Sequence, residues 1–190
     1  MRYKDENKNE NIFNATIQLI NEIGLAETSM SKIAKKAKVS ASTIYVYFEN
    51  KEDLLNKLYL HVKNMMTEAI FNTFDASLPL QEAFEDSLRK FVDFTLANKD
   101  YFLFIEQFQN SPLLNKISRD EITDMCEPLY SLFEKGKKQC VFKQVDTNLL
   151  SIFTLQPVMQ FVKEHFNGTC TINEANLNKV IQMSWDAIKA

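Results

Sequence analysis

Hydroxyl, aromatic and basic side chains gather in one stretch of this chain, from Thr28 to Lys51. Between Thr28 and Phe48 there are four lysines and no acidic residue, whereas residues 58–190 carry 13 basic and 17 acidic residues. Hydroxyls and ammonium groups are the donors that proteins offer to phosphate oxygens. A basic island in an acidic chain therefore indicates a surface that meets nucleic acid. The alternative is a solvated lysine-rich helix on an ordinary helical domain.

Two short helical patterns position these side chains. Met30, Ile33, Ala34 and Ala37 recur at the spacing of one helix face, and Ser29 or Thr28 can cap that helix. After a turn, Ser40 can cap a second helix from about residue 41 to 47. Two short helices joined by a few residues, the second rich in hydroxyls and aromatic rings, predict a helix-turn-helix.

The segment GLAETSMSKIAKKAKVSASTIYVYFENKEDLL resembles the DNA-binding domain of the TetR family of bacterial transcriptional repressors. The likeness rests on a glycine-containing loop, a T-[ST]-hydrophobic start, IA..A.VS, a helix ending in Y-x-[HY]-F, and K-E-x-L. It covers Gly24 to Leu55; beyond Leu55 only the helical architecture and length are similar. The resemblance implies an operator-binding homodimer that responds to a small effector.

The resemblance also assigns roles within the motif, where the second helix lies in the major groove. It places phosphate contacts at Thr28 or Ser29, and at Ser40, Thr43, Tyr45, Tyr47 and Lys51. It places base contacts at Ala41, Ser42 and Val46. The chain departs from the common pattern by having Ala41-Ser42 where Lys-Gly is frequent, and Val46 in place of a polar residue. Small apolar side chains suit thymine methyl groups, which predicts partly hydrophobic readout. For Tyr45 a core position is the alternative.

Composition indicates an all-α protein, because three glycines and four prolines among 190 residues leave few of the turns that β-hairpins need. We expect a three-helix DNA-binding domain with the helix-turn-helix over residues 1–50, and a helical-bundle effector-binding and dimerisation domain over residues 51–190. The first domain should share a core of Phe13, Leu19, Ile33, Ala34, Ile44 and Phe48.

Helical periodicity and caps predict the remaining elements. The first helix should run from about residue 10 to 23 and end at Gly24. Later helices are expected at about 51–74, 79–97, 101–109, 118–140 broken or bent near Pro128, 146–165 with a kink at Pro157, and 173–188. Capping boxes are predicted at Ser118 with Glu121 and at Thr171 with Glu174.

Several classes of function find no support in the sequence. No apolar run approaches the roughly 18 residues of a membrane span, and the first residues lack the apolar segment of a signal peptide, so we expect a cytoplasmic protein. No cysteine or histidine spacing indicates a metal, and no cofactor motif is present. No nucleophile–base pair or phosphate-binding glycine loop indicates an enzyme. A helical protein-interaction adaptor without sequence-specific DNA binding is the alternative.

Apolar residues of the second domain predict the effector site. For any single phenylalanine a core position is the simpler interpretation. Together, aromatic residues from neighbouring helices could line an apolar cavity for a small, mostly apolar effector. The candidates are Phe91, Phe94, Phe102, Phe104, Phe108, Met125, Phe153 and Gln156.

The last two helices predict the dimer, because they carry more apolar surface than one layer can bury. The helix at 146–165 is apolar nearly all round and should be buried on most sides. Packing both helices against a two-fold mate would form a four-helix interface. We expect Phe161 and Trp185 as its aromatic anchors, with the subunit core as the alternative for either residue.

Overall fold

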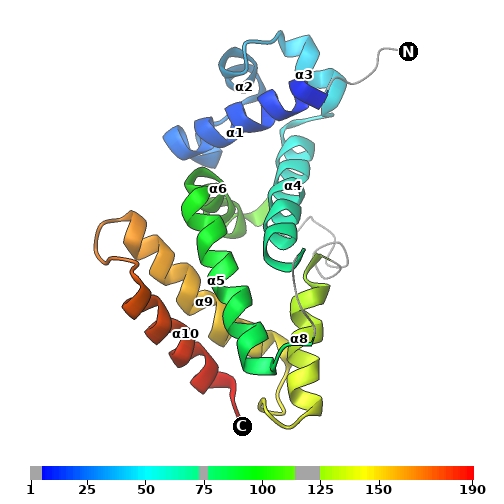
Figure 1. Cartoon of the computed structure of the whole chain (residues 1–190). Helices are drawn as coiled ribbons and strands as arrows, with labels where there is room; N and C mark the ends of the chain where they lie inside the picture. The colour runs from blue at the N-terminus through cyan, green and yellow to red at the C-terminus, as the bar shows by residue number, and fades with distance from the viewer. Residues whose placement is uncertain (1–5, 73–76, 114–124) are drawn as a thin grey trace. The chain divides into compact units, whose positions relative to one another are not determined.

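The structure is a computed structural model that describes residues 6–72, 77–113 and 125–190 (Figure 1). Over these residues the chain is helical, and its only β-type pairing is an isolated bridge between Phe142 and Lys189. The helices are α1 (Glu6–Glu27), α2 (Met30–Lys36), α3 (Ala41–Tyr47), α4 (Lys51–Phe71), α5 (Leu80–Ala97), α6 (Lys99–Gln109), α8 (Glu127–Lys138), α9 (Thr147–Phe166) and α10 (Glu174–Ile188). The predicted all-α class is confirmed.

The chain divides into two compact units. The first comprises residues 1–65 and 98–122, and the second comprises residues 66–97 and 123–190. The first unit therefore holds α1, α2, α3, most of α4, and α6, while the second holds α5, α8, α9 and α10. These units group helices by contact, whereas the predicted domains follow chain order, so the boundary between residues 50 and 51 stays a prediction.

The core of the helix-turn-helix is the one that the sequence predicts. All six expected residues are buried: Phe13, Leu19, Ile33, Ala34, Ile44 and Phe48. The rings of Phe13 and Phe48 lie 5.6 Å apart, which joins α1 to the end of α3. These six side chains form one small core that the three helices share, and this core holds α3 in a fixed orientation.

Gly24 interrupts α1 just before the helix-turn-helix. Its φ of 81° and ψ of 164° are not helical, so the regular part of α1 ends there, as predicted. A φ in this range suits glycine because it has no Cβ atom. The carbonyl of Gly24 accepts a 2.8 Å hydrogen bond from the hydroxyl of Thr28, which fixes the approach to α2.

Helix α6 completes the first unit by packing against α1 and α4. The side-chain amide of Asn21 donates to the carbonyl of Asp100 at 3.0 Å, and Gln107 Nε2 donates to Asn21 Oδ1 at 3.3 Å. The ring of Phe108 stacks on Tyr59 of α4 with centroids 4.7 Å apart. A helix far along the chain is thus attached directly to the first helix.

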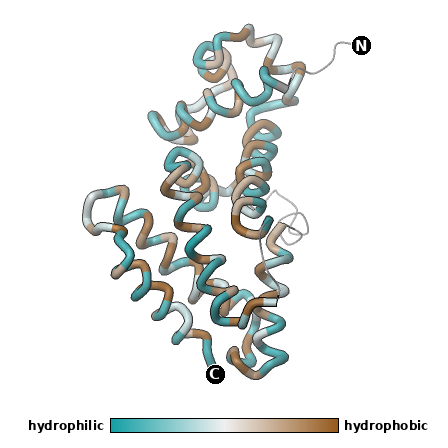
Figure 2. Tube along the Cα trace, viewed as in Figure 1, coloured by the Kyte–Doolittle hydropathy of each residue, from teal (hydrophilic) through white to brown (hydrophobic). Residues whose placement is uncertain are grey.

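The second unit is organised around aromatic side chains. Trp185 of α10 meets the rings of Phe84 and Phe142 edge to face, at 5.3 and 5.2 Å. Phe142 also covers Gly136 of α8, where an added Cβ would lie 2.0 Å from the ring. Glycine at 136 is therefore the residue that lets α8 approach this cluster. Along α9 and α10, apolar and polar residues alternate around the helices (Figure 2).

One predicted helix cap differs from the one that the structure shows. The structure caps α10 with Asn173, whose side chain accepts from the backbone of Asn176, so the capping box at Thr171 is wrong. The predicted start at Ser118 with Glu121 lies outside the described residues. In the described part of that segment, α8 begins at Glu127 with Pro128 in its first turn, where a missing N–H costs nothing. The prediction of a break or bend near Pro128 is confirmed, because a helix begins beside it.

Candidate nucleic-acid interface

One side of α3 is open to solvent while the other holds the helix in place. Ala41, Ser42, Tyr45 and Val46 are exposed, and their spacing puts them on one helix face. Tyr45 is 57% exposed and Val46 is 53% exposed, which is unusual for large apolar side chains. Ile44 on the opposite side is fully buried. The Tyr45 ring therefore does not occupy the core position that was its alternative.

Hydroxyl groups gather at the start of α3. Ser40 is the N-cap, and its Oγ accepts a 3.1 Å hydrogen bond from the backbone N–H of Thr43. The same oxygen lies 2.8 Å from both Ser42 Oγ and Thr43 Oγ1. Three adjoining hydroxyls at an exposed helix start form a surface that can donate to phosphate oxygens. The phosphate contacts of Ser40 and Thr43 stay predictions.

Thr28 and Ser29, at the start of α2, were alternatives for one predicted phosphate contact, and the structure places them in different environments. Thr28 is 2% exposed, and its hydroxyl donates to Gly24 within the unit. Ser29 is half-buried and caps α2 by accepting from the backbone N–H of Lys32 at 3.3 Å. Of this pair, Ser29 keeps a hydroxyl near the surface and Thr28 stabilises the loop.

Acidic residues of α1 lie against the lysines of α2. Lys32 Nζ donates to the carbonyl of Glu27 at 2.7 Å, with the Glu27 carboxylate 3.9 Å away. Lys36 Nζ lies 2.5 Å from a carboxylate oxygen of Glu22. Glu22 and Glu27 precede the motif in sequence, so they lie outside the stretch from Thr28 to Phe48 that carries no acidic residue. The basic island is thus partly neutralised by its own unit.

The turn between α2 and α3 and the start of α4 flank the exposed face. Lys38, in the turn, is exposed and has a positive φ of 56°. Tyr47, at the end of α3, is half-buried with its ring 6.3 Å from that of Phe48. Lys51 opens α4, and its ammonium group donates to a backbone carbonyl of α1. Burial lowers the pKa of Lys51, and the nearby Glu27 carboxylate opposes that shift.

The eight predicted effector contacts divide between the two units. Phe102, Phe104 and Phe108 are buried within the first unit, on α6. In the second unit Phe91 is buried, Phe94 and Met125 are half-buried, and Phe153 and Gln156 are exposed. A cavity of about 270 Å³ in the first unit is lined by none of the eight. Their role in binding an effector stays a prediction.

The predicted dimer anchors occupy different environments. Trp185 is 6% exposed and packed in the aromatic cluster of the second unit, which corresponds to the core alternative for this residue. Phe161 is half-buried. The prediction that α9 is buried on most sides is wrong for the single chain, because α9 exposes Leu149, Ile152 and Phe153 by 46%, 50% and 56%. On α10 Met183 is 71% exposed.

The described residues contain neither a cluster of metal-ligand type nor a helix able to cross a membrane. No cluster of three histidine, cysteine or acidic side chains is arranged to hold an ion within residues 6–72, 77–113 and 125–190. All three cysteines are free thiols. Within the same residues, no helix has the length and apolarity that a membrane crossing requires.

Two family models match this chain. Residues 12–58 match the model described as "Bacterial regulatory proteins, tetR family". Residues 79–189 match the model described as "Tetracyclin repressor-like, C-terminal domain", which covers more than half of the chain. The first match includes α2, α3 and the start of α4, and therefore the exposed face described above.

Individual relatives are similar over their whole length. A Haemophilus influenzae protein called an uncharacterised HTH-type transcriptional regulator is 26% identical over 194 residues, covering 100% of both chains. A TetR family transcription regulator from Marinobacter aquaeolei has a structure that matches with a TM-score of 0.89 and 25% identity, over 100% of this chain and 99% of that one. A Vibrio parahaemolyticus protein described as a putative TetR family regulator matches with a TM-score of 0.83 and 29% identity, over 96% and 99% of the two chains.

Proposed function

This chain belongs to the TetR family of transcriptional regulators, with a DNA-binding helix-turn-helix near its amino terminus, and we propose that it is a ligand-responsive repressor. It binds a pseudo-palindromic operator in the cytoplasm as a homodimer, and a small, mostly apolar effector releases it. Family membership argues against both an enzyme and an adaptor that does not bind DNA.

The observation that carries DNA recognition is the exposed face of α3. Val46 and Tyr45 offer apolar and aromatic surface to solvent, which costs free energy unless a partner covers it. Val46 offers methyl groups that suit a thymine methyl, and Ser42 offers a hydroxyl that can bond to several base edges. Tyr45, with Ser40 and Thr43 at the start of the helix, would contact phosphates. The operator is therefore expected to contain thymine at the position that Val46 meets.

Dimerisation is supported by apolar side chains that α9 and α10 leave exposed. The two helices themselves pack against each other in the second unit. Leu149, Ile152 and Phe153 recur at the spacing of one helix face, and Met183 of α10 is also exposed. Pairing this surface with its two-fold copy would bury it in an isologous four-helix interface. Phe153 and Gln156 would then contact the partner subunit instead of an effector. Half-sites about 34–36 Å apart would suit such a dimer.

Effector response would act through α4. The boundary between the compact units falls within α4, between Met65 and Met66, so each unit contains part of this helix. An effector that binds the second unit more tightly in its DNA-incompetent arrangement shifts the population by that difference in affinity, and by no more. Operator DNA must then weaken effector binding by the same factor. A compound whose affinity is the same with and without operator is not the effector.

Selection of bound sites from random duplex DNA tests the proposal directly. The wild-type chain should enrich a pseudo-palindrome. Val46→Asp should abolish enrichment, because it places a carboxylate against the DNA acceptors. Val145→Asp is a matched control, since Val145 is also exposed but lies in the second unit. The proposal fails if wild type enriches no sequence, or if both variants behave alike.

A further inference from the structure

A cleft of about 270 Å³ opens in the first unit between α1, α4 and α6. Its floor is apolar and buried: Phe13, Ile17 and Leu58 are 5%, 2% and 0% exposed. Small-molecule sites usually measure about 300–1,000 Å³ and combine an apolar lining with a few polar groups. This cleft lies just below that range, so it suits only a small ligand.

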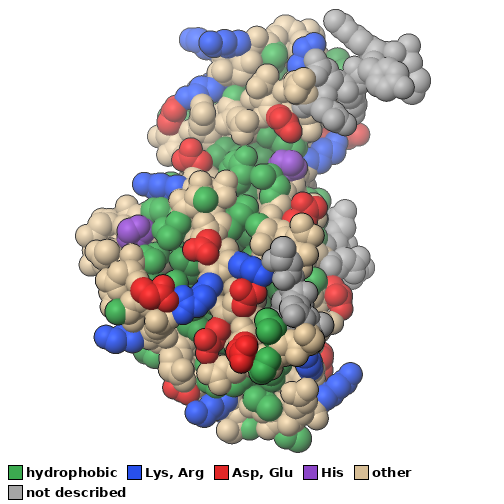
Figure 3. All heavy atoms as spheres, viewed as in Figure 1, with side chains coloured by type: hydrophobic (Ala, Val, Ile, Leu, Met, Phe, Trp, Pro, Cys, Tyr) green, Lys and Arg blue, Asp and Glu red, His purple; other side chains and the backbone are tan. Residues whose placement is uncertain are grey.

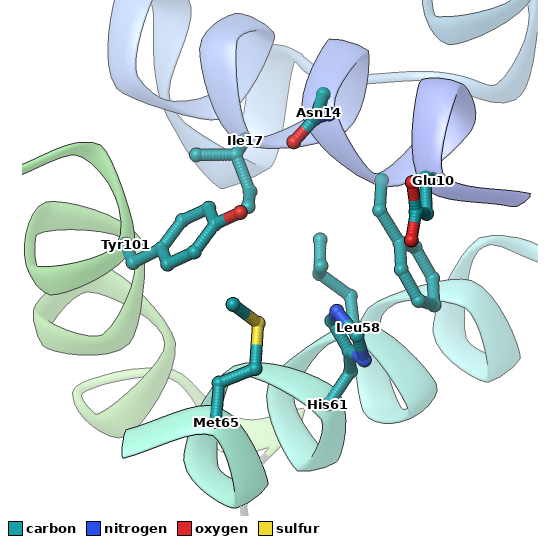
Figure 4. A pocket seen from close by; sticks show the side chains of 8 residues that line it. Glu10, Asn14, Ile17, Leu58, His61, Met65 and Tyr101 are labelled. Carbon is teal, nitrogen blue, oxygen red and sulfur yellow. The ribbon is translucent and has the colours of Figure 1, made fainter. Parts of the chain in front are cut away.

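The mouth of the cleft supplies the polar groups. Tyr101 of α6 and Met65 of α4 point into it, facing Ile17 of α1 (Figure 4). Glu10 of α1 and His61 of α4 line the same side of the opening in that view. Among the residues that the structure describes, the lining contains no lysine or arginine. Glu10 therefore supplies a negative charge that no lysine or arginine of the described lining neutralises.

This combination of groups selects a ligand by charge. A carboxylate at the rim attracts a cation, and the aromatic ring of Tyr101, which points into the cleft, attracts it further. The thioether of Met65 adapts to an apolar body of irregular shape. The Glu10 carboxylate would repel an anion, and no lysine or arginine of the described lining would offset that repulsion. We propose that the cleft binds a small organic cation with a compact apolar body, at a site separate from the proposed effector site of the second unit.

Such a ligand would act on the helix-turn-helix directly. The cleft is walled by α1, which holds the core of the motif, and by α4, which begins where the motif ends. A ligand that contacts both helices favours the arrangement in which its contacts are best made. The cation therefore changes operator affinity by the ratio of its affinities for the free and DNA-bound arrangements, and operator DNA changes cation affinity equally.

Titration calorimetry with benzyltrimethylammonium tests the site without DNA. Benzyl alcohol is the neutral comparator, since it keeps the ring and lacks the charge. Wild type should bind the cation and show at least tenfold weaker affinity for the alcohol. Glu10→Gln should weaken cation binding by about three- to fivefold, the range expected of a solvent-exposed ion pair. Glu82→Gln removes an exposed carboxylate from α5 in the second unit and should leave binding unchanged.

A second pair of variants places the binding in the cleft. Asn14 is exposed on α1 and lines the cleft, so Asn14→Trp should fill the mouth and abolish binding. Asn11 is exposed on the same helix but does not line the cleft, and Asn11→Trp should bind as wild type does. Absence of binding, equal affinity for the neutral comparator, or unchanged affinity in both Glu10→Gln and Asn14→Trp would overturn the proposal. Because DNA is absent, these results do not depend on whether the chain represses transcription.

Discussion

The ammonium group of Lys51 donates a 2.6 Å hydrogen bond to the carbonyl oxygen of Leu25. Leu25 directly follows the non-helical Gly24 in α1, and Lys51 is the first residue of α4. This one bond joins the two helices on either side of the helix-turn-helix. An ammonium group has three hydrogens, so the bond leaves others for a DNA phosphate. Lys51 therefore combines a structural contact with its predicted role in DNA binding.

Lys51→Ala is expected to affect stability and DNA binding together. Loss of the bond to Leu25 should lower the free energy of unfolding by about 1 kcal/mol. Loss of a phosphate contact should weaken operator and random DNA by similar factors and reduce the slope of log affinity against log salt by about one. Chemical denaturation and DNA titration at several salt concentrations measure the two effects.

Lys143 provides a matched control for this variant, because its ammonium group donates to the carbonyl of Ala187 at 2.6 Å in the second unit. Lys143→Ala should lose similar stability and keep the salt dependence of DNA binding. An unchanged salt slope in Lys51→Ala would leave Lys51 with the structural role alone.

Val46→Ala is expected to change which sequences are preferred. Val46 is 53% exposed, so truncation leaves the core intact and removes methyl groups that would contact a base. Discrimination at one operator position should fall by roughly 1–3 kcal/mol, while affinity for random DNA stays close to that of wild type. Competition binding with operators substituted one base pair at a time measures this. Equal weakening on every sequence would contradict a base contact at Val46.

The helix-turn-helix could be predicted from sequence because its signals are local. Ser40 as a cap, Gly24 as a break and the spacing of Ile33, Ala34 and Ile44 each depend on neighbours a few residues away. The same logic chose the wrong cap for α10, where both Thr171 and Asn173 are acceptable caps by residue type. The structure uses Asn173, whose amide oxygen reaches the backbone of Asn176 at 2.9 Å.

Contacts between distant segments could not be predicted from sequence. Asn21 and Gln107 are separated by 86 residues, and no periodicity indicates that α6 packs on α1. The cleft beside Tyr101 exists because of that packing, so the sequence contains no signal for it. Exposure of Phe153 was missed for a related reason. An apolar helix face has the same pattern whether its own chain or a second copy covers it.

Glu134 should make stability depend on pH at the acid end. Hydrogen bonds, from Lys137 first and then from Thr147, hold the pKa of Glu134 below its usual value. A depressed carboxyl pKa contributes stability above the unfolded-state pKa, and that contribution is lost as pH falls through the folded-state pKa. Glu134→Gln should therefore lower the melting temperature at pH 7, and the difference from wild type should shrink below about pH 4. Thermal unfolding of both proteins between pH 3 and 7 measures it. A constant gap between wild type and Glu134→Gln across this range would contradict the prediction.

Phe153→Asp is expected to separate dimerisation from folding. The Phe153 side chain is 56% exposed in the single chain, so a carboxylate there meets water in the monomer and costs little. In a dimer formed through α9 and α10 the same carboxylate would be buried against its copy without a partner, which is expensive. We therefore expect a folded, helical monomer that has lost operator affinity by more than about tenfold, because one helix-turn-helix makes half of the contacts. Light scattering and circular dichroism measure the two properties.

Trp185→Ala is the counterpart that removes core packing. Trp185 is 6% exposed and lies between Phe84 and Phe142, so truncation leaves a cavity within the subunit. Unfolding should become easier by about 3–5 kcal/mol, with any loss of dimer following from loss of fold.

Phe161→Asp adds a third case, since Phe161 is half-buried and was predicted as an anchor. If Phe161 contacts the partner, this variant behaves like Phe153→Asp; if it belongs to the core, it behaves like Trp185→Ala. A well-folded Phe153→Asp dimer that still binds the operator would show that this face of α9 lies outside the interface, because no dimer tolerates two unpaired carboxylates buried against each other.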